Sequence, residues 1–186
     1  ADAYDDGGAD NYEHAVPVLR ELGVPATVFL ATGAVEDRVP FWWQVPGLSD
    51  AEIEAMKRRS HKWIEAQMAG RPDFRKAHAA DFLTWEQVRE MGRSGLVSFG
   101  PHGHRHVLLT TLTREEAVED VRRCWNLLQQ RAPEATVPVL AWPNGNARDD
   151  LAAELEALGL RAAVGTGRGA VRVRGDARWN LPRNNV

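Results

Sequence analysis

The 186-residue sequence lacks several features that would each indicate a particular class of protein. Its single cysteine, Cys124, excludes an internal disulfide and a cysteine metal cluster within this sequence. No run of about 18 apolar residues is present, so we expect no membrane-spanning helix in it. The net charge is −3 and no long basic run occurs, which argues against a nucleic-acid partner, because phosphate binding requires clustered lysine and arginine.

The beginning of the sequence also lacks the marks of a signal peptide. Residues 1–4 carry neither a basic region nor an apolar core, and no methionine precedes them. We therefore expect a mature product or a fragment, from which any targeting segment is absent. Bacterial cytoplasmic and exported locations both stay open, as does the oligomeric state.

The composition and the spacing of apolar residues predict one α/β domain over residues 1–186. With 44% hydrophobic residues, the chain can bury one sizeable core. Helices expected at 10–23, 84–95, from 113 onward and at 148–158 alternate with strands expected at 24–31, 96–100, 136–142 and 160–164. Pro17 is expected to bend the first helix. Capping boxes are predicted at the starts of three helices, from Asp10 with Glu13, Thr84 with Gln87 and Thr113 with Glu116.

Such alternation predicts parallel strands with helical crossovers, in either an open doubly wound sheet or a barrel. In both architectures, ligands bind at the carboxyl ends of the strands. Three polar segments directly follow strand-like runs and should therefore meet at one mouth: Asp5-Asp6-Gly7, residues 102–106, and Trp142-Pro143-Asn144-Gly145.

The first two of these segments carry residues suited to a metal-dependent hydrolase. Residues 102–106 read His-Gly-His-Arg-His and hold half of the six histidines. Together with Asp5-Asp6, they supply two histidines and a carboxylate for one divalent metal, and a second carboxylate placed to act as a base. Each segment alone has an ordinary alternative, a turn for Asp-Asp-Gly and a solvated or structural loop for the histidines.

At these residues the sequence resembles the polysaccharide deacetylases, the carbohydrate esterases with a NodB homology domain. Ala3-Tyr4-Asp5-Asp6-Gly7 is similar to their Thr-Phe-Asp-Asp-Gly motif, and residues 102–106 match their His-x-x-x-His motif. Ala141-Trp142-Pro143-Asn144-Gly145 resembles their third motif, Arg-x-Pro-aromatic. The similarity covers residues 1–35 and 82–186. It implies a distorted, incomplete (β/α) barrel of about seven strands.

The resemblance also implies a role for each matching residue. Asp6, His102 and His106 are expected to bind a divalent metal, with zinc favoured, and Asp5 is expected to be the general base. The backbone N–H of Asn144 is expected to stabilise the oxyanion. The implied activity is removal of N-acetyl groups from the sugars of a polysaccharide or oligosaccharide, with O-acetyl groups left open as a second target.

Three features depart from the family pattern. Ala141 replaces an arginine that in many relatives orients the base, and Gly103 replaces a small hydroxyl residue. No histidine follows His106 in this sequence, so the late histidine that protonates the leaving amine has no match. We expect Arg183 at the same mouth, as a candidate substrate-binding residue, if residues 181–183 form a strand. A carbohydrate-binding pseudoenzyme on the same barrel stays open as an alternative function.

His104 supports a different metal site as a further alternative. Residues two apart on a strand share a face, so His104 can pair with His102 or His106, as in amidohydrolase-like enzymes. That motif normally lies on the first strand of such barrels, where this sequence carries two carboxylates. The other histidines are expected to be structural: His14, His61 and His78.

Residues 37–81 are expected to form a helical insertion. Pro40-Phe41-Trp42-Trp43 precedes a polar helical stretch at 49–69. Two interpretations stay open, in which the aromatic residues either pack a small flap onto the barrel or form a wall on which sugar rings stack. We name Trp42, Trp43 and Trp142 as candidate substrate-binding residues, and an N-acetylated glycan as the partner.

Overall fold

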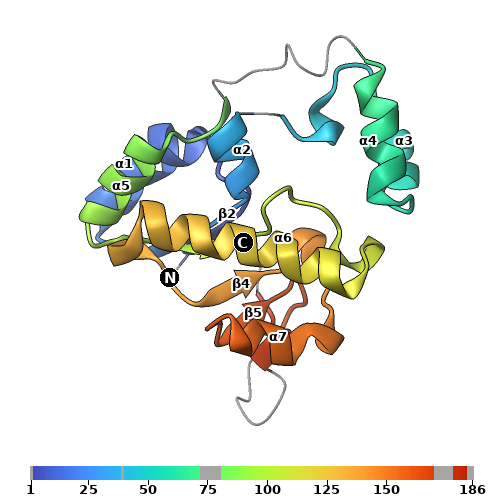
Figure 1. Cartoon of the computed structure of the whole chain (residues 1–186). Coiled ribbons are helices and arrows are strands. Elements are labelled where there is room, and N and C mark those ends of the chain that lie inside the picture. Colours follow the sequence, from blue (N-terminus) through green and yellow to red (C-terminus); the bar gives the residue numbers. More distant parts are fainter. Residues whose placement is uncertain (1, 39, 72–80, 170–177, 184–186) are drawn as a thin grey trace.

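The computed structural model describes residues 2–38, 40–71, 81–169 and 178–183 (Figure 1). The strands are β1 (Asp2–Tyr4), β2 (Ala26–Leu30), β3 (Val97–Pro101), β4 (Val139–Ala141) and β5 (Ala162–Val164). The α-helices are α1 (Val16–Leu22), α2 (Thr32–Asp37), α3 (Asp50–Met56), α4 (His61–Ala69), α5 (Trp85–Arg93), α6 (Arg114–Arg131) and α7 (Ala152–Ala157). Shorter helical turns are η1 (Asn11–Ala15), η2 (Trp42–Gln44), η4 (Leu109–Thr111), η5 (Pro133–Ala135), η6 (Pro143–Gly145) and η7 (Asp149–Leu151).

Every ladder between these strands is parallel. β1, β2 and β3 form one sheet in that order, and β4 pairs with β5 in a second. A parallel bridge from Phe99 to Thr136 links β3 to the segment before β4, and another from Val164 to Leu181 places an extended segment beside β5. Helices lie in the connections, as parallel pairing requires. The α/β class is therefore confirmed, whereas the expected count of about seven strands is not.

Local sequence signals set the ends of several helices. The predicted capping boxes begin α5 and α6, where Thr84 and Thr113 each accept a hydrogen bond from the backbone three residues ahead. The capping box predicted at Asp10 is wrong, because its side chain accepts no such bond. The chain there forms the π-helical turn η1, and α1 then begins with Pro17 in its first turn, where the missing N–H breaks no helical hydrogen bond.

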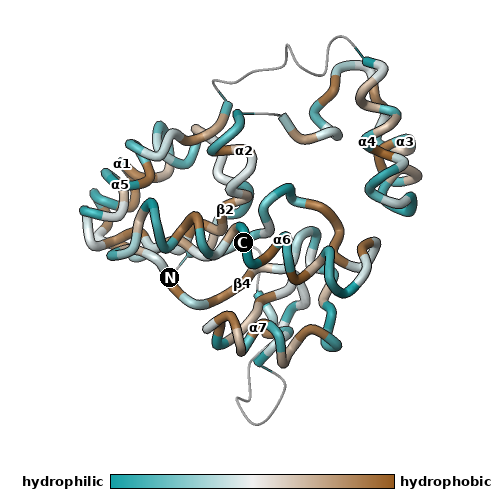
Figure 2. The backbone as a smooth tube through the Cα atoms, in the orientation of Figure 1, coloured by the Kyte–Doolittle hydropathy of each residue, from teal (hydrophilic) through white to brown (hydrophobic). Residues whose placement is uncertain are grey.

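Two apolar cores share helix α6. One core packs β1, β2 and β3 against α1 and α5, and α6 contributes Cys124 and Leu128 to it. The other packs β4 and β5 against α7, and α6 contributes Val121 and Trp125. In Figure 2, α6 alternates along its length between hydrophilic and hydrophobic colouring, as expected of a helix with one buried face. This helix therefore joins the two sheets into one fold.

The expected insertion at 37–81 contains η2, α3 and α4 in its described part. These elements surround a small apolar cluster of their own, and α3 and α4 lie together at one edge of the molecule (Figure 1). Within the described part of the chain, ion pairs connect α4 to the rest of the fold, from Lys62 to Glu116 at 3.3 Å and from Glu65 to Arg105 at 3.6 Å. The division into one domain with an insertion stays a prediction.

The sequence did not predict α2, which follows β2 after one residue and is too short to show a helical period. No helix in the described part of the chain is long and apolar enough to cross a membrane. His78, expected to be structural, lies outside the described residues.

Candidate active site

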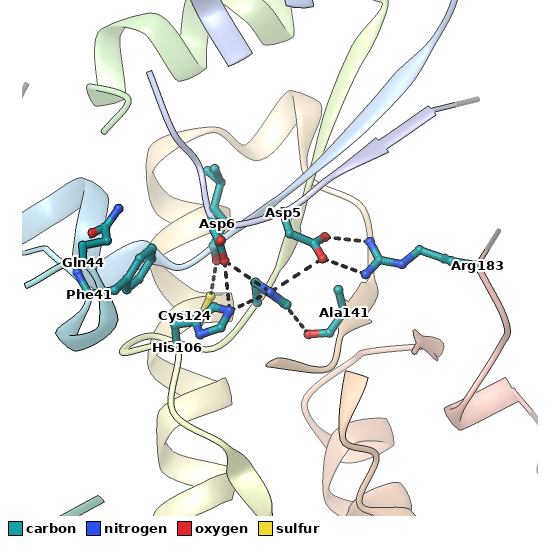
Figure 3. Close-up of polar contacts among 10 residues, drawn as sticks. Asp5, Asp6, Phe41, Gln44, His106, Cys124, Ala141 and Arg183 are labelled. Carbon is teal, nitrogen blue, oxygen red and sulfur yellow. Dashed lines mark hydrogen bonds and ion pairs between the residues drawn. The ribbon is translucent and has the colours of Figure 1, made fainter. Parts of the chain in front are cut away.

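The candidate metal ligands meet at the carboxyl ends of parallel strands. Asp6 follows β1, and His106 lies in the loop after β3 (Figure 3). His102 directly follows β3. The Nε2 atom of His106 lies 2.9 Å from Oδ1 of Asp6 and 3.0 Å from Nε2 of His102. The third separation, from His102 Nε2 to Asp6 Oδ1, is 3.6 Å. The structure therefore brings the three predicted ligands together.

These separations match the requirements of a tetrahedral metal site. Zinc bonds to nitrogen and oxygen of about 2.0–2.1 Å, set at tetrahedral angles, separate ligand atoms by about 3.3 Å. The three observed distances, 2.9, 3.0 and 3.6 Å, lie on either side of this value. Asp6 Oδ1 is also buried without a well-oriented hydrogen-bond donor in the described part of the chain. The residues present therefore fit a divalent cation.

The surroundings of His102 orient its ring and keep it neutral. Because the Ala141 carbonyl only accepts, the 2.8 Å hydrogen bond shows that Nδ1 is protonated and leaves the Nε2 lone pair for a ligand. Burial, followed by the proximity of His106, lowers the pKa of His102 to about 4, although Asp5 and Asp6 oppose the shift. Burial also raises the pKa of Asp6, but the rings of His106 and His102 outweigh it and lower that pKa below its usual value. A neutral imidazole beside a carboxylate is the state that metal binding requires.

Asp120 of α6 holds the loop that carries the histidines. Its carboxylate accepts the backbone N–H of His104 at 2.7 Å and the Nε–H of Arg105 at 3.0 Å. Gly103 has a φ of +78°, and a Cβ atom there would lie 2.9 Å from Asp120 Oδ1, so glycine is required at this position. The sequence interpretation missed Asp120. The signal that identifies it is its place on the otherwise apolar, buried face of α6.

His104 contacts the start of α2 instead of the candidate ligands. Its Nδ1 lies 3.0 Å from the Thr32 hydroxyl, and its carbonyl accepts the Gly33 N–H at 2.7 Å. Among the described residues, the group able to share one metal ion comprises Asp6, His102 and His106, without His104. The amidohydrolase-like pairing of His104 is therefore not formed.

Arg183 makes a two-pronged contact with Asp5 (Figure 3). Its Nη1 and Nη2 atoms donate to the two carboxylate oxygens at 2.6 and 2.7 Å, and its Nε donates to the Gly165 carbonyl at 3.1 Å. Such a contact fixes the plane of the carboxylate, whose Oδ2 lies 3.9 Å from His102 Nε2. The structure thus places Arg183 at the expected mouth. It contacts Asp5 there and is not among the residues that line the adjoining cavity, so its expected substrate-binding role finds no support.

A cavity of about 270 Å³ opens beside these residues. Asp5, Asp6, His102, His106 and Asn144 line it, together with Trp42, Trp43, Ile53, Lys57, Arg59, His61, Ile64, Val107, Leu108 and Thr111. Three of these residues come from the end of α3, the following turn and the start of α4, namely Lys57, Arg59 and His61. The sequence did not predict that these side chains line the cavity, because it does not show which way the turn between α3 and α4 faces.

The two tryptophans of η2 pack within the insertion and also line the cavity, and the sugar-stacking role stays a prediction. Trp43 stacks on Phe41 with ring centroids 4.5 Å apart, and its ring centroid lies 4.8 Å from that of His106, with the two ring planes inclined at 60°. Trp42 packs against the apolar cluster of the insertion. Both side chains also line the cavity. Packing and exposure to a ligand are therefore compatible at these positions.

The segment after β4 places its two candidates differently. Asn144 lines the cavity with a φ of 56°, and its backbone N–H forms no hydrogen bond with any residue that the structure describes. This N–H is available to a ligand. Trp142 is fully buried, and its Nε1 donates to the Trp179 carbonyl at 2.6 Å. Its assignment as a substrate-binding residue is therefore wrong, and Trp142 instead anchors the segment that carries Asn144.

Comparison with known families agrees with this geometry. The family model described as polysaccharide deacetylase matches residues 3–163. No curated protein is similar enough in sequence to count as a match.

Solved deacetylase structures share the fold. The deacetylase PplD of Streptococcus pyogenes, in complex with acetate, is 20% identical with a TM-score of 0.66, and 98% of this chain aligns with 62% of it. The BpsB deacetylase domain from Bordetella bronchiseptica is 19% identical with a TM-score of 0.67, and 97% of this chain aligns with 69% of it. IcaB from Ammonifex degensii is 22% identical with a TM-score of 0.66, and 99% of this chain aligns with 66% of it. The chain thus spans about two thirds of the length of each.

Proposed function

The chain belongs to the polysaccharide deacetylase family, and we propose that it removes N-acetyl groups from glycans by metal-dependent hydrolysis. The observation that carries the proposal is that three candidate ligands, Asp6, His102 and His106, share one cavity with a second carboxylate, Asp5. Two imidazoles and one carboxylate are a ligand set typical of catalytic zinc. The bound cation supplies Lewis acidity, which acidifies water and polarises an acyl carbonyl.

Asp5 acts as the general base in this proposal. It takes a proton from the attacking water as the new C–O bond forms at the acetamide carbon. Arg183 fixes the carboxylate plane for this transfer. The same carboxyl group then holds the proton that the departing amine requires when the C–N bond breaks, so that acetate and a free amino sugar result.

Asn144 stabilises the charge that develops on the acetyl oxygen. Its backbone N–H has no other hydrogen bond among the described residues and lies in a segment that lines the cavity. Because the donor is a main-chain group, any residue except proline can supply it. Asparagine in place of the aromatic residue of the family motif is therefore compatible with activity.

The partner in this proposal is an N-acetylated polysaccharide or oligosaccharide. Trp42 and Trp43 present aromatic surface in the cavity, on which a sugar ring can pack. The contact of Arg183 with Asp5 favours turnover over a carbohydrate-binding pseudoenzyme, because it orients the base in a chain that has Ala141 in the usual arginine position.

Acetate release from N-acetylated chito-oligosaccharides, with and without a chelator, tests the proposal. We expect release that the chelator abolishes and added zinc restores. Asp5→Asn should retain metal and lose about 100- to 10,000-fold in turnover, the usual contribution of a positioned base. O-acetylated glycans assayed in parallel show whether an alcohol can also leave. Glycan binding without acetate release, by protein shown to hold metal by atomic emission, would contradict the proposal and favour the pseudoenzyme.

A further inference from the structure

The insertion brings two cationic side chains to the cavity. Lys57 follows α3 directly and Arg59 lies in the turn before α4, and both line the cavity that contains the candidate metal ligands. They share this wall with Trp42 and Trp43. Neither cation matches a metal, base or oxyanion role in the proposed hydrolysis.

The contacts of these two cations within the protein are weak. Lys57 Nζ lies 2.6 Å from Glu54 Oε1, but the Glu54 side chain is 63% exposed, and surface pairs of this kind are easily exchanged for another anion. The guanidinium carbon of Arg59 lies 5.4 Å from the ring centroid of Trp63, and a cation–π contact between two exposed side chains contributes little. No carboxylate in the described part of the chain lies within ion-pair distance of Arg59.

The acidic groups near the cavity already have partners. Asp5 is held by Arg183, and Asp6 faces His102 and His106. On α4, Glu65 lies 3.0 Å from His61 and 3.6 Å from Arg105. Among the residues that the structure describes, the charge at the cavity wall that has no strong internal partner is therefore positive.

We propose that the glycan acted on here carries an anionic group, a carboxylate or a phosphate, near the acetylated sugar, and that Lys57 and Arg59 bind it. The proposal rests on the deacetylase function above and names the substrate class for it. Arginine binds either oxyanion through paired N–H groups, and lysine adds a point charge. Trp42 and Trp43 pack on the sugar rings while the two cations contact the charged substituent.

Three N-acetylated oligosaccharides of equal length test this assignment: a neutral one, one that alternates with a hexuronic acid, and one that carries a sugar phosphate. For the wild-type protein we expect KM to be about 10-fold lower for at least one anionic oligosaccharide at low ionic strength, with the difference reduced by added salt. The arm with the lower KM identifies the carboxylate or the phosphate. Lys57→Gln and Arg59→Gln should each weaken this preference, and together they should remove it.

Arg58→Gln is the matched control, because Arg58 is exposed in the same turn and is not among the residues that line the cavity. It should leave the preference intact. Equal KM values for all three oligosaccharides, or equal loss in Arg58→Gln and Arg59→Gln, would overturn the assignment. A lower melting temperature in Lys57→Gln with unchanged preference would mean that Lys57 only stabilises the end of α3.

Binding to the Asp5→Asn variant, measured by calorimetry, separates this inference from the proposed function. A failure to release acetate from any of the oligosaccharides would overturn the deacetylase proposal. Binding by Asp5→Asn that does not distinguish anionic from neutral oligosaccharides would overturn the anion assignment, whatever the result for acetate release.

Discussion

Arg183→Gln removes the guanidinium that holds both oxygens of Asp5. The side chains of Arg183 and Asp5 are 14% and 32% exposed, so solvent screens part of the interaction. Breaking this pair should therefore cost less than breaking a fully buried one. Loss of orientation cannot cost more than loss of the base itself, about 100- to 10,000-fold. Because Asp5 stays in place, we expect kcat to fall about 10- to 100-fold, which corresponds to about 1.4–2.7 kcal/mol in the barrier.

The assay is steady-state acetate release together with metal content by atomic emission. KM should change little, because Arg183 contacts the base and is not among the residues that line the cavity. Metal content should be unchanged, since the three candidate ligands remain. Arg178→Gln is the control in the same part of the chain, where it removes a surface ion pair with Glu156 at 2.9 Å, and it should leave kcat as it is.

A double-mutant cycle decides whether Arg183 acts through Asp5. In protein that already carries Asp5→Asn, the additional Arg183→Gln change should reduce kcat by no more than about threefold (about 0.65 kcal/mol), since the group that it positions no longer accepts a proton. Fully additive losses would show that Arg183 contributes by another route. Normal kcat in Arg183→Gln, with metal bound, would refute the positioning role.

Three further changes test the candidate metal ligands, the loop that carries the histidines, and the tryptophan Trp42 in the cavity wall. His106→Ala should abolish metal binding while His104→Ala retains it, as measured by atomic emission, and the opposite result would overturn the ligand set. Asp120→Asn should weaken the hold on the histidine loop and cost about 1–2 kcal/mol of unfolding free energy, measured by urea denaturation, because it keeps one acceptor but loses the charge that Arg105 contacts. Trp42→Ala should raise KM more for long oligosaccharides than for the shortest accepted one. An equal rise for every length, with a lower melting temperature, would show that Trp42 only packs the insertion.

The sequence predicted those parts of the site that depend on the order of strands. Asp6 and His102 each follow a strand of the same parallel sheet, so they meet because the carboxyl ends of parallel strands lie at one edge. The capping boxes at Thr84 and Thr113 were equally predictable, since their hydrogen bonds span three residues. Both kinds of inference need only the local chain and a simple rule of topology.

The parts that could not be predicted depend on packing between distant segments. Trp142 belongs to a family motif, yet its side chain is turned into the core toward Trp179, which the motif does not show. Asp120 becomes important only because α6 packs beneath the histidine loop. The direction of Lys57 depends on how the insertion docks, through contacts such as that of Glu65 with Arg105. None of these contacts leaves a periodic pattern in the sequence.

We infer that Arg183 takes the place of the arginine that the family motif carries at position 141. At position 141, where the family motif carries arginine, alanine still contributes its carbonyl, which orients His102. The arginine comes instead from the segment beyond Leu181, which bridges β5 in parallel and so ends at the same side of the fold as β1. A guanidinium needs only to reach both oxygens of Asp5, and the segment after Leu181 brings that of Arg183 close enough. The substitution at Ala141 is therefore no argument for lost activity, because the requirement falls on the position of the guanidinium in space and not on its position in the chain.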